Sequence, residues 1–95
     1  MTVVWTPQAE QDRSDIWDYI AADSAAAAAR VDQLFGLAAA KLATHPRIGK
    51  PADVPGVREL VPHERYRLAY EIAPDGTVWI LALTHTARRW PPLHR

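Results

Sequence analysis

Apolar residues recur at helical spacing in two segments of the N-terminal half of the chain. The apolar positions are Ala9, Ile16, Trp17 and Ile20 in the first segment, and Val31, Leu34, Phe35, Ala38 and Leu42 in the second. They predict helices over residues 7–22 and 25–44, each with one apolar side. Thr6-Pro7 is typical of an N-cap followed by proline in the first helical position. Only two residues separate the segments, which predicts an antiparallel helical hairpin.

Four further segments are rich in β-branched and aromatic residues and predict strands: residues 2–5, 57–61, 66–72 and 77–84. In the segment 66–72 apolar and mixed positions alternate, as in a strand with one buried face. The segment 77–84 is apolar in both alternating sets, which predicts a central strand buried on both faces. Residues 73–76 (Ala-Pro-Asp-Gly) predict a hairpin turn, and residues 47–56, with two Gly and two Pro, predict a loop.

The predicted order of elements is therefore β-α-α-β-β-β. This order predicts an α+β fold in which the helical hairpin packs on one face of a mainly antiparallel sheet of four strands. With 95 residues the chain is long enough for one modest core, so a single domain over residues 1–95 is expected.

Composition excludes several kinds of chemistry. The chain has no cysteine, which removes disulfides, thiolate catalysis and cysteine-based zinc sites. Its four histidines lack close metal-ligand spacing, and there is no glycine-rich phosphate loop, so neither a metal nor a cofactor is expected. No window approaches about 20 continuous apolar residues, and the first residues carry no basic leader segment, so we expect a cytoplasmic protein without a membrane span.

Positive charge gathers toward the C-terminus, although the formal net charge is zero. Residues 49–95 hold seven Lys or Arg and five Asp or Glu, and no acid follows Asp75. The apolar strand 77–84 runs directly into His85, Arg88, Arg89 and Trp90. Cations and an aromatic ring at one end of a strand suit an anionic ligand, and a nucleic acid first of all.

Several short motifs, in this order and spacing, resemble the RelE/ParE superfamily of toxins from bacterial type II toxin–antitoxin modules, most closely its RelE/StbE branch. They are Ala9, Asp15-Ile16 and Tyr19-Ile20; Leu42, His45-Pro46 and Gly49-Lys50-Pro51; Arg58-Glu59-Leu60, Tyr66-Arg67-Leu68 and Tyr70; and His85 with Arg88-Arg89-Trp90-Pro91. Each motif is weak alone. Together they are specific for the superfamily and much less so for the activity.

The resemblance implies a toxin that a cognate antitoxin silences by wrapping it with a C-terminal segment. Toxins of the RelE type enter the ribosome and cleave the mRNA, whereas those of the ParE type poison DNA gyrase without nuclease activity. We expect a ribosome-dependent mRNA endonuclease, with gyrase poisoning as the alternative and a decayed, antitoxin-only module as a third possibility. A groove along the helices around Trp17 and Phe35 is the expected seat of the antitoxin.

Cleaving RNA without a metal requires a base for the 2′-hydroxyl, cations for the charge on phosphorus and an acid for the leaving oxygen. By resemblance, Arg67 and Arg88 match the two active-site arginines of the RelE type. Arg58 falls where that type carries the first of two lysines, and Leu60 where it carries the second. Arg58 is therefore expected to bind phosphate, but the RelE-type base is missing. An ordinary alternative for Arg67 is a solvated residue paired with Glu59 or Glu71.

His85 is the main candidate for the missing proton transfer, because imidazole titrates near neutral pH. Its alternative is an ordinary hydrogen-bonded residue, and Glu64 is a second candidate base. Substrate contacts are expected from Arg65, Arg89 and Trp90. Arg89 is the register alternative to Arg88. Trp90 takes the place of the C-terminal tyrosine with which RelE-type toxins stack on a base, unless it merely covers the sheet edge.

Overall fold

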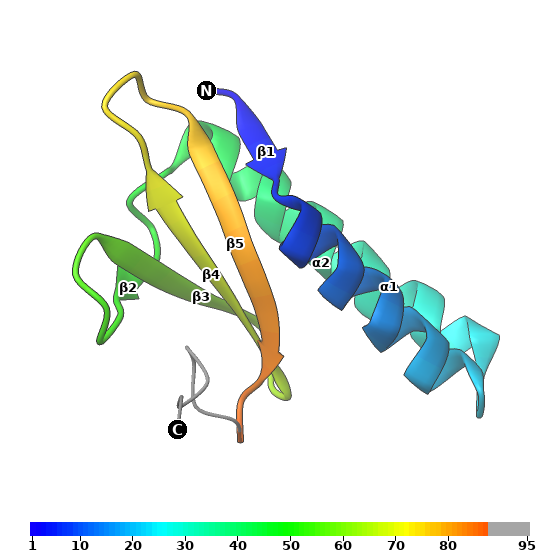
Figure 1. Ribbon diagram of the computed structural model, residues 1–95. Coiled ribbons are helices and arrows are strands. Elements are labelled where there is room, and N and C mark those ends of the chain that lie inside the picture. The colour runs from blue at the N-terminus through cyan, green and yellow to red at the C-terminus, as the bar shows by residue number, and fades with distance from the viewer. Residues whose placement is uncertain (88–95) are drawn as a thin grey trace.

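The computed structural model describes residues 1–87 as two helices packed on a five-stranded sheet (Figure 1). The helices are α1 (Pro7–Ala21) and α2 (Ala25–Thr44). The strands are β1 (Val3–Trp5), β2 (Lys50–Pro51), β3 (Val57–His63), β4 (Tyr66–Ile72) and β5 (Val78–His85). The sheet order is β1-β5-β4-β3-β2, with β1 parallel to β5 and the other neighbours antiparallel. The predicted α+β class and helical hairpin are confirmed.

The prediction of four strands is wrong, because β2 lies inside the segment predicted as a loop. Lys50 pairs with Glu59 and Pro51 with Arg58, so two residues add a fifth strand to the edge of the sheet. A two-residue strand has no alternation to detect, and its proline argued for a loop. A contact between residues distant in the sequence holds this segment in place: the Gly49 amide donates a hydrogen bond to the Tyr70 hydroxyl.

Both helices begin where the sequence supplies a cap. The Thr6 hydroxyl accepts a hydrogen bond from the Ala9 amide at 3.2 Å, and the Ser24 hydroxyl accepts one from the Ala27 amide at 3.1 Å. The helices are then joined by the bidentate pair of Arg13 and Asp32, with Nε–Oδ1 at 2.6 Å and Nη2–Oδ2 at 3.0 Å. The Arg13 guanidinium also lies 4.7 Å from the ring centre of Trp5 in β1. These contacts fix the helical hairpin against the start of the sheet.

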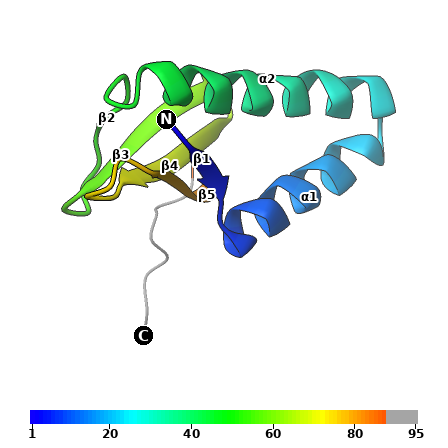
Figure 2. The ribbon, with the colours of Figure 1, turned by 90° about the horizontal axis from the view of Figure 1, so that it is seen from above.

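The core lies between the helical hairpin and one face of the sheet, as the view from above shows (Figure 2). The sheet contributes Tyr66, Leu68, Tyr70, Val78, Ile80 and Leu83, and the helices contribute Ala9, Phe35, Ala38 and Leu42. Phe35 is only 1% exposed, so it belongs to this core and cannot line a groove for the antitoxin as expected. We call the opposite side of the sheet the open face.

The last strand, β5, was predicted to be central, and it lies inside the sheet, between β1 and β4, although β4 is the middle strand of the five. It is not buried throughout on both faces, because Trp79, on the open face, is 37% exposed. A bulge at Leu81 shifts its register, since Ala82 pairs with Ala69 but Ile80 pairs with Tyr70. The short β1 pairs only with the first part of β5. Farther along β5, α1 covers the free edge of the strand, where the Leu83 amide donates a hydrogen bond to the Asp12 carboxylate at 3.0 Å. Neither helix within residues 1–87 combines the length and the apolar character needed to cross a bilayer.

Candidate functional site

The open face carries a row of charged side chains from three neighbouring strands. Arg67 of β4 lies beside Glu59 of β3, with Nη1 3.5 Å from Oε2, and Lys50 of β2 lies on the other side of Glu59, with Nζ 3.8 Å from Oε1. The register explains the row, because Glu59 pairs with Lys50 on one side and with Ala69, two residues beyond Arg67, on the other. We call Lys50, Glu59 and Arg67 the open-face cluster.

Within the cluster, Glu59 and Arg67 are the less exposed members. Their side chains are 16% and 27% exposed, against 72% for Lys50. Arg67 also donates from Nη2 to the Thr86 carbonyl at 3.1 Å, just past the end of β5. The guanidinium is therefore held by a carboxylate and a backbone carbonyl, which is the partnered state that the ordinary alternative foresaw for Arg67. Arg67 therefore lies beside the end of β5, at Thr86, which precedes Arg88 by two residues in the sequence.

Glu59 is a candidate general base to which the sequence interpretation gave no catalytic role. Glu64, considered as a base, is exposed in the β3–β4 turn, where its backbone carbonyl accepts from the Thr86 hydroxyl at 3.1 Å. The alternation in β3 was the available signal: Glu59 and Arg58 must point to opposite faces of a strand. Leu60 lies on the same face of β3 as Arg58, and Val57 lies on the same face as Glu59. Since both faces hold an apolar residue, the sequence alone does not indicate which face the helices leave open.

Arg58 does not join the open-face cluster. It pairs with Tyr70 in the register and so lies on the helix side of the sheet. Its Nη1 donates to the Gly49 carbonyl at 2.7 Å and to the Arg47 carbonyl at 3.4 Å. The structure therefore separates two of the arginines expected to share one phosphate, Arg58 and Arg67, onto opposite faces.

His85 also lies on the helix side, opposite Tyr66 in the register and with the two ring centres 5.8 Å apart. Its Nδ1 accepts a hydrogen bond from the Ala87 amide at 3.1 Å. His63 flanks Tyr66 from the other strand at 5.7 Å and accepts in the same way from the Arg65 amide at 3.1 Å. Both rings thus hold ordinary turn hydrogen bonds, and the His85 ring does not face Arg67.

The remaining predicted substrate contacts are only partly covered by the structure. Arg65 is exposed in the β3–β4 turn, and its carbonyl accepts from the Thr86 amide at 2.8 Å. Arg88, Arg89 and Trp90 lie outside the described residues. Within residues 1–87, no three His, Asp or Glu side chains gather in a way that could hold a metal ion.

The pKa of Asp75 is lowered by hydrogen bonds from the Thr77 backbone amide and, to a smaller extent, from the Thr77 hydroxyl. Asp75 lies in the β4–β5 turn, away from the open-face cluster.

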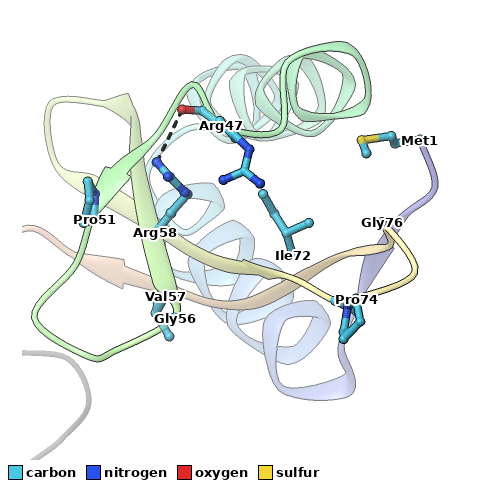
Figure 3. Close-up of a pocket in the computed structure, with 10 residues that line it drawn as sticks. Met1, Arg47, Pro51, Gly56, Val57, Arg58, Ile72, Pro74 and Gly76 are labelled. Atoms are coloured by element: carbon cyan, nitrogen blue, oxygen red, sulfur yellow. Dashed lines mark hydrogen bonds between the residues drawn. The ribbon is translucent and has the colours of Figure 1, made fainter.

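A second positive region is an open pocket of about 560 Å³ toward the β4–β5 turn (Figure 3). Its lining includes Arg58 and Arg47, together with aliphatic and proline side chains. The sequence predicts only a loop around Arg47, because nothing in it indicates that Arg47 lies near Arg58 and Ile72. Residues 1–87 therefore hold two separate cationic sites, the open-face cluster and this pocket.

Solved structures of toxin–antitoxin systems share the fold. The chromosomal ParDE system of Pseudomonas aeruginosa superimposes with a TM-score of 0.76 at 24% identity, covering 90% of this chain and 95% of that one. The toxin–antitoxin complex RelBE2 of Mycobacterium tuberculosis gives a TM-score of 0.58 at 32% identity, covering 88% and 95%. The helical hairpin on a mainly antiparallel sheet is thus the architecture of RelE/ParE-type toxins.

Sequence comparison identifies the family. The sequence model of the family described as the ParE toxin of type II toxin–antitoxin systems (parDE) matches residues 3–90 of this chain. Toxin RelE2 of Caulobacter vibrioides is 41% identical over 86 residues, which cover 90% of this chain and 96% of that protein. The chain belongs to the ParE toxin family within the RelE/ParE superfamily. Because the family carries the ParE name and this relative carries the RelE name, the RelE/StbE branch stays a prediction.

Proposed function

We propose that this chain is the toxin of a type II toxin–antitoxin module and that it cleaves mRNA on the ribosome at the open-face cluster. The observation that carries the proposal is the pairing of Glu59 with Arg67 on the face that the helices leave free. It places a carboxylate and a guanidinium within 3.5 Å of each other, which supplies the two groups that RNA cleavage needs most. The relationship to RelE2 of Caulobacter vibrioides supports the nuclease over a purely binding role.

The proposed reaction begins when the scissile phosphate binds Arg67 and competes with Glu59 for the guanidinium. The released Glu59 carboxylate takes the proton of the 2′-hydroxyl, and the 2′ oxygen attacks phosphorus. Arg67 stabilises the charge that develops on the phosphoryl oxygens. The bond to the 5′ oxygen then breaks, and the products are a 2′,3′-cyclic phosphate and a 5′-hydroxyl.

The leaving 5′ oxygen needs a proton, and His85 is the proposed donor. Because its ring lies on the Tyr66 side, it must give up the hydrogen bond from Ala87 and turn around the end of β5. Arg88 is proposed as a second phosphate ligand, and Arg65, Arg89 and Trp90 as contacts to the flanking RNA. We leave Arg58 out of this catalytic set, because its guanidinium is held on the helix side by the Gly49 carbonyl. Unlike His85, which pairs with Tyr66 next to Arg67, Arg58 pairs with Tyr70 farther along β4.

The test is primer extension on a reporter mRNA in a reconstituted translation reaction. The proposal expects new 5′ ends within codons that appear only while ribosomes translate. Intact mRNA with unimpaired translation would contradict it, and ends that appear equally without ribosomes would remove the ribosome from the mechanism.

Gyrase poisoning is the second candidate, and the observation that favours it is the match to the ParE toxin family. The replacement of the RelE-type lysines by Arg58 and Leu60 points the same way. Under this function, the open-face cluster is a protein contact without chemistry. Inhibition of supercoiling by purified gyrase, together with intact mRNA in the reaction above, would establish it in place of cleavage.

We also propose that the protein binds a cognate antitoxin. The similar solved structure of the toxin–antitoxin complex RelBE2 of Mycobacterium tuberculosis supports this partner. Because Phe35 is buried, the seat of the antitoxin has to be formed by side chains that are exposed on the helical hairpin. Tyr19 is 79% exposed, Leu37 57% and Trp17 38%. Large apolar side chains on the surface of a small domain are typical of a partner interface.

A further inference from the structure

We propose that the pocket formed around Arg47 and Arg58 binds a carboxylate on a peptide segment of a partner protein. This inference goes beyond the proposed function and does not depend on it, because the pocket shares no residue with the open-face cluster. The pocket lies on the helix side, between the start of β3 and the β4–β5 turn (Figure 3).

Both arginines bring positive charge to the pocket, and the charge of Arg58 is held in place. The Arg58 guanidinium is fixed by its 2.7 Å hydrogen bond to the Gly49 carbonyl, and Gly49 is itself fixed, because its amide donates to the Tyr70 hydroxyl at 2.9 Å. In Figure 3 the Arg47 side chain extends into the space between Arg58 and Ile72. A guanidinium that is already ordered loses little freedom when it binds an anion.

No acidic residue neutralises these arginines within the described part of the chain. The pocket lining contains no Asp or Glu, and neither Arg47 nor Arg58 forms an ion pair among residues 1–87. A guanidinium has five N–H donors in a fork that matches a carboxylate, and backbone carbonyls occupy only Nη1 of Arg58. An anion is therefore the expected ligand.

The rest of the lining favours a peptide over a nucleic acid. It is aliphatic or proline-rich and includes Met1, Pro51, Val57, Ile72, Ala73 and Pro74. None of the described residues that line the pocket is aromatic and able to stack on a base, and stacking is the usual way that single strands are held without base-specific contacts. A Glu or Asp flanked by an aliphatic side chain satisfies both the arginines and this lining.

The experiment follows amide and arginine side-chain signals of the ¹⁵N-labelled protein by NMR while the capped peptide acetyl-Leu-Glu-Val-amide is added. A ligand this small should bind in the range of about 1 mM. We expect saturable shifts at Arg47, Arg58 and Ile72 and none of comparable size with acetyl-Leu-Gln-Val-amide. Equal shifts with both peptides, or shifts confined to other regions, would overturn the proposal.

Variants and anions sharpen the result. Arg47→Gln should weaken peptide binding about tenfold, since one charged hydrogen-bonding group is lost. The control Arg30→Gln, exposed on α2, should leave binding unchanged. Arg58→Lys keeps a cation beside Gly49, and it should weaken binding while the fold persists. If uridine monophosphate binds the pocket more tightly than the Glu peptide, the site belongs to a nucleic acid and the proposal is wrong.

Discussion

At the scale of single residues, Tyr70 organises the loop that carries β2. Its hydroxyl donates to the Pro46 carbonyl at 2.7 Å and accepts from the Gly49 amide at 2.9 Å, while its ring is fully buried. The alternation of β4 predicted Tyr70 as a core residue, but not the contact of its hydroxyl. That contact joins positions more than twenty residues apart, and local patterns do not report on such distances.

Gly49 should not tolerate a side chain. A Cβ there would lie 2.6 Å from the Tyr70 hydroxyl and 2.7 Å from the Glu59 carbonyl, so Gly49→Ala must push the loop away from the sheet. We expect a loss of about 1–3 kcal/mol in the free energy of unfolding, measured in urea. Gly36→Ala is the matched control, because its nearest neighbour would be 3.6 Å away and alanine favours a helix. Equal stability of the two variants would contradict the tight fit at Gly49.

At the scale of elements, the helices were easier to predict than the strand faces. The caps at Thr6 and Ser24 and the long apolar periodicity gave the helical bounds to within one residue. In β3, by contrast, charged and apolar residues occupy both alternating sets, so Arg58 and Glu59 could not be assigned to a face. Only the register with β4 decides, and register depends on the whole sheet.

The helical hairpin should bind the antitoxin through its exposed apolar residues. Leu37→Gln removes a side chain that is 57% exposed, so it should reduce co-purification with the antitoxin at least tenfold. The midpoint of thermal unfolding of the Leu37→Gln variant should stay close to that of the parent protein. Ala40→Gln, exposed on the same helix, adds the same amide group without removing a large apolar side chain and should bind normally. Full binding by the Leu37 variant would move the interface elsewhere.

At the scale of the whole molecule, the two faces of the sheet differ in what covers them, and we propose that catalysis takes place on the face without helices. The helices and core occupy one face, and the open-face cluster lies on the other. The order of elements, apart from the two-residue β2, and the family resemblance could be predicted from the sequence. The separation of Arg58 from Arg67 could not, because it follows from which side of the sheet the helices cover. Arg88, Arg89 and Trp90 lie outside the described residues, so their roles stay predictions.

The central claim is that Glu59 and Arg67 cleave RNA together, and rates of cleavage on translating ribosomes test it most directly. Glu59→Gln keeps the shape of the side chain but removes the base, so the rate should fall by about 10²–10⁴. The cleavage rate of the Arg67→Ala variant should fall by a comparable factor. The control Glu71→Gln changes an exposed carboxylate on the open face of β4, the strand that carries Arg67, and should keep the parent rate. A Glu59→Gln variant that folds normally and cleaves at the parent rate would contradict the account.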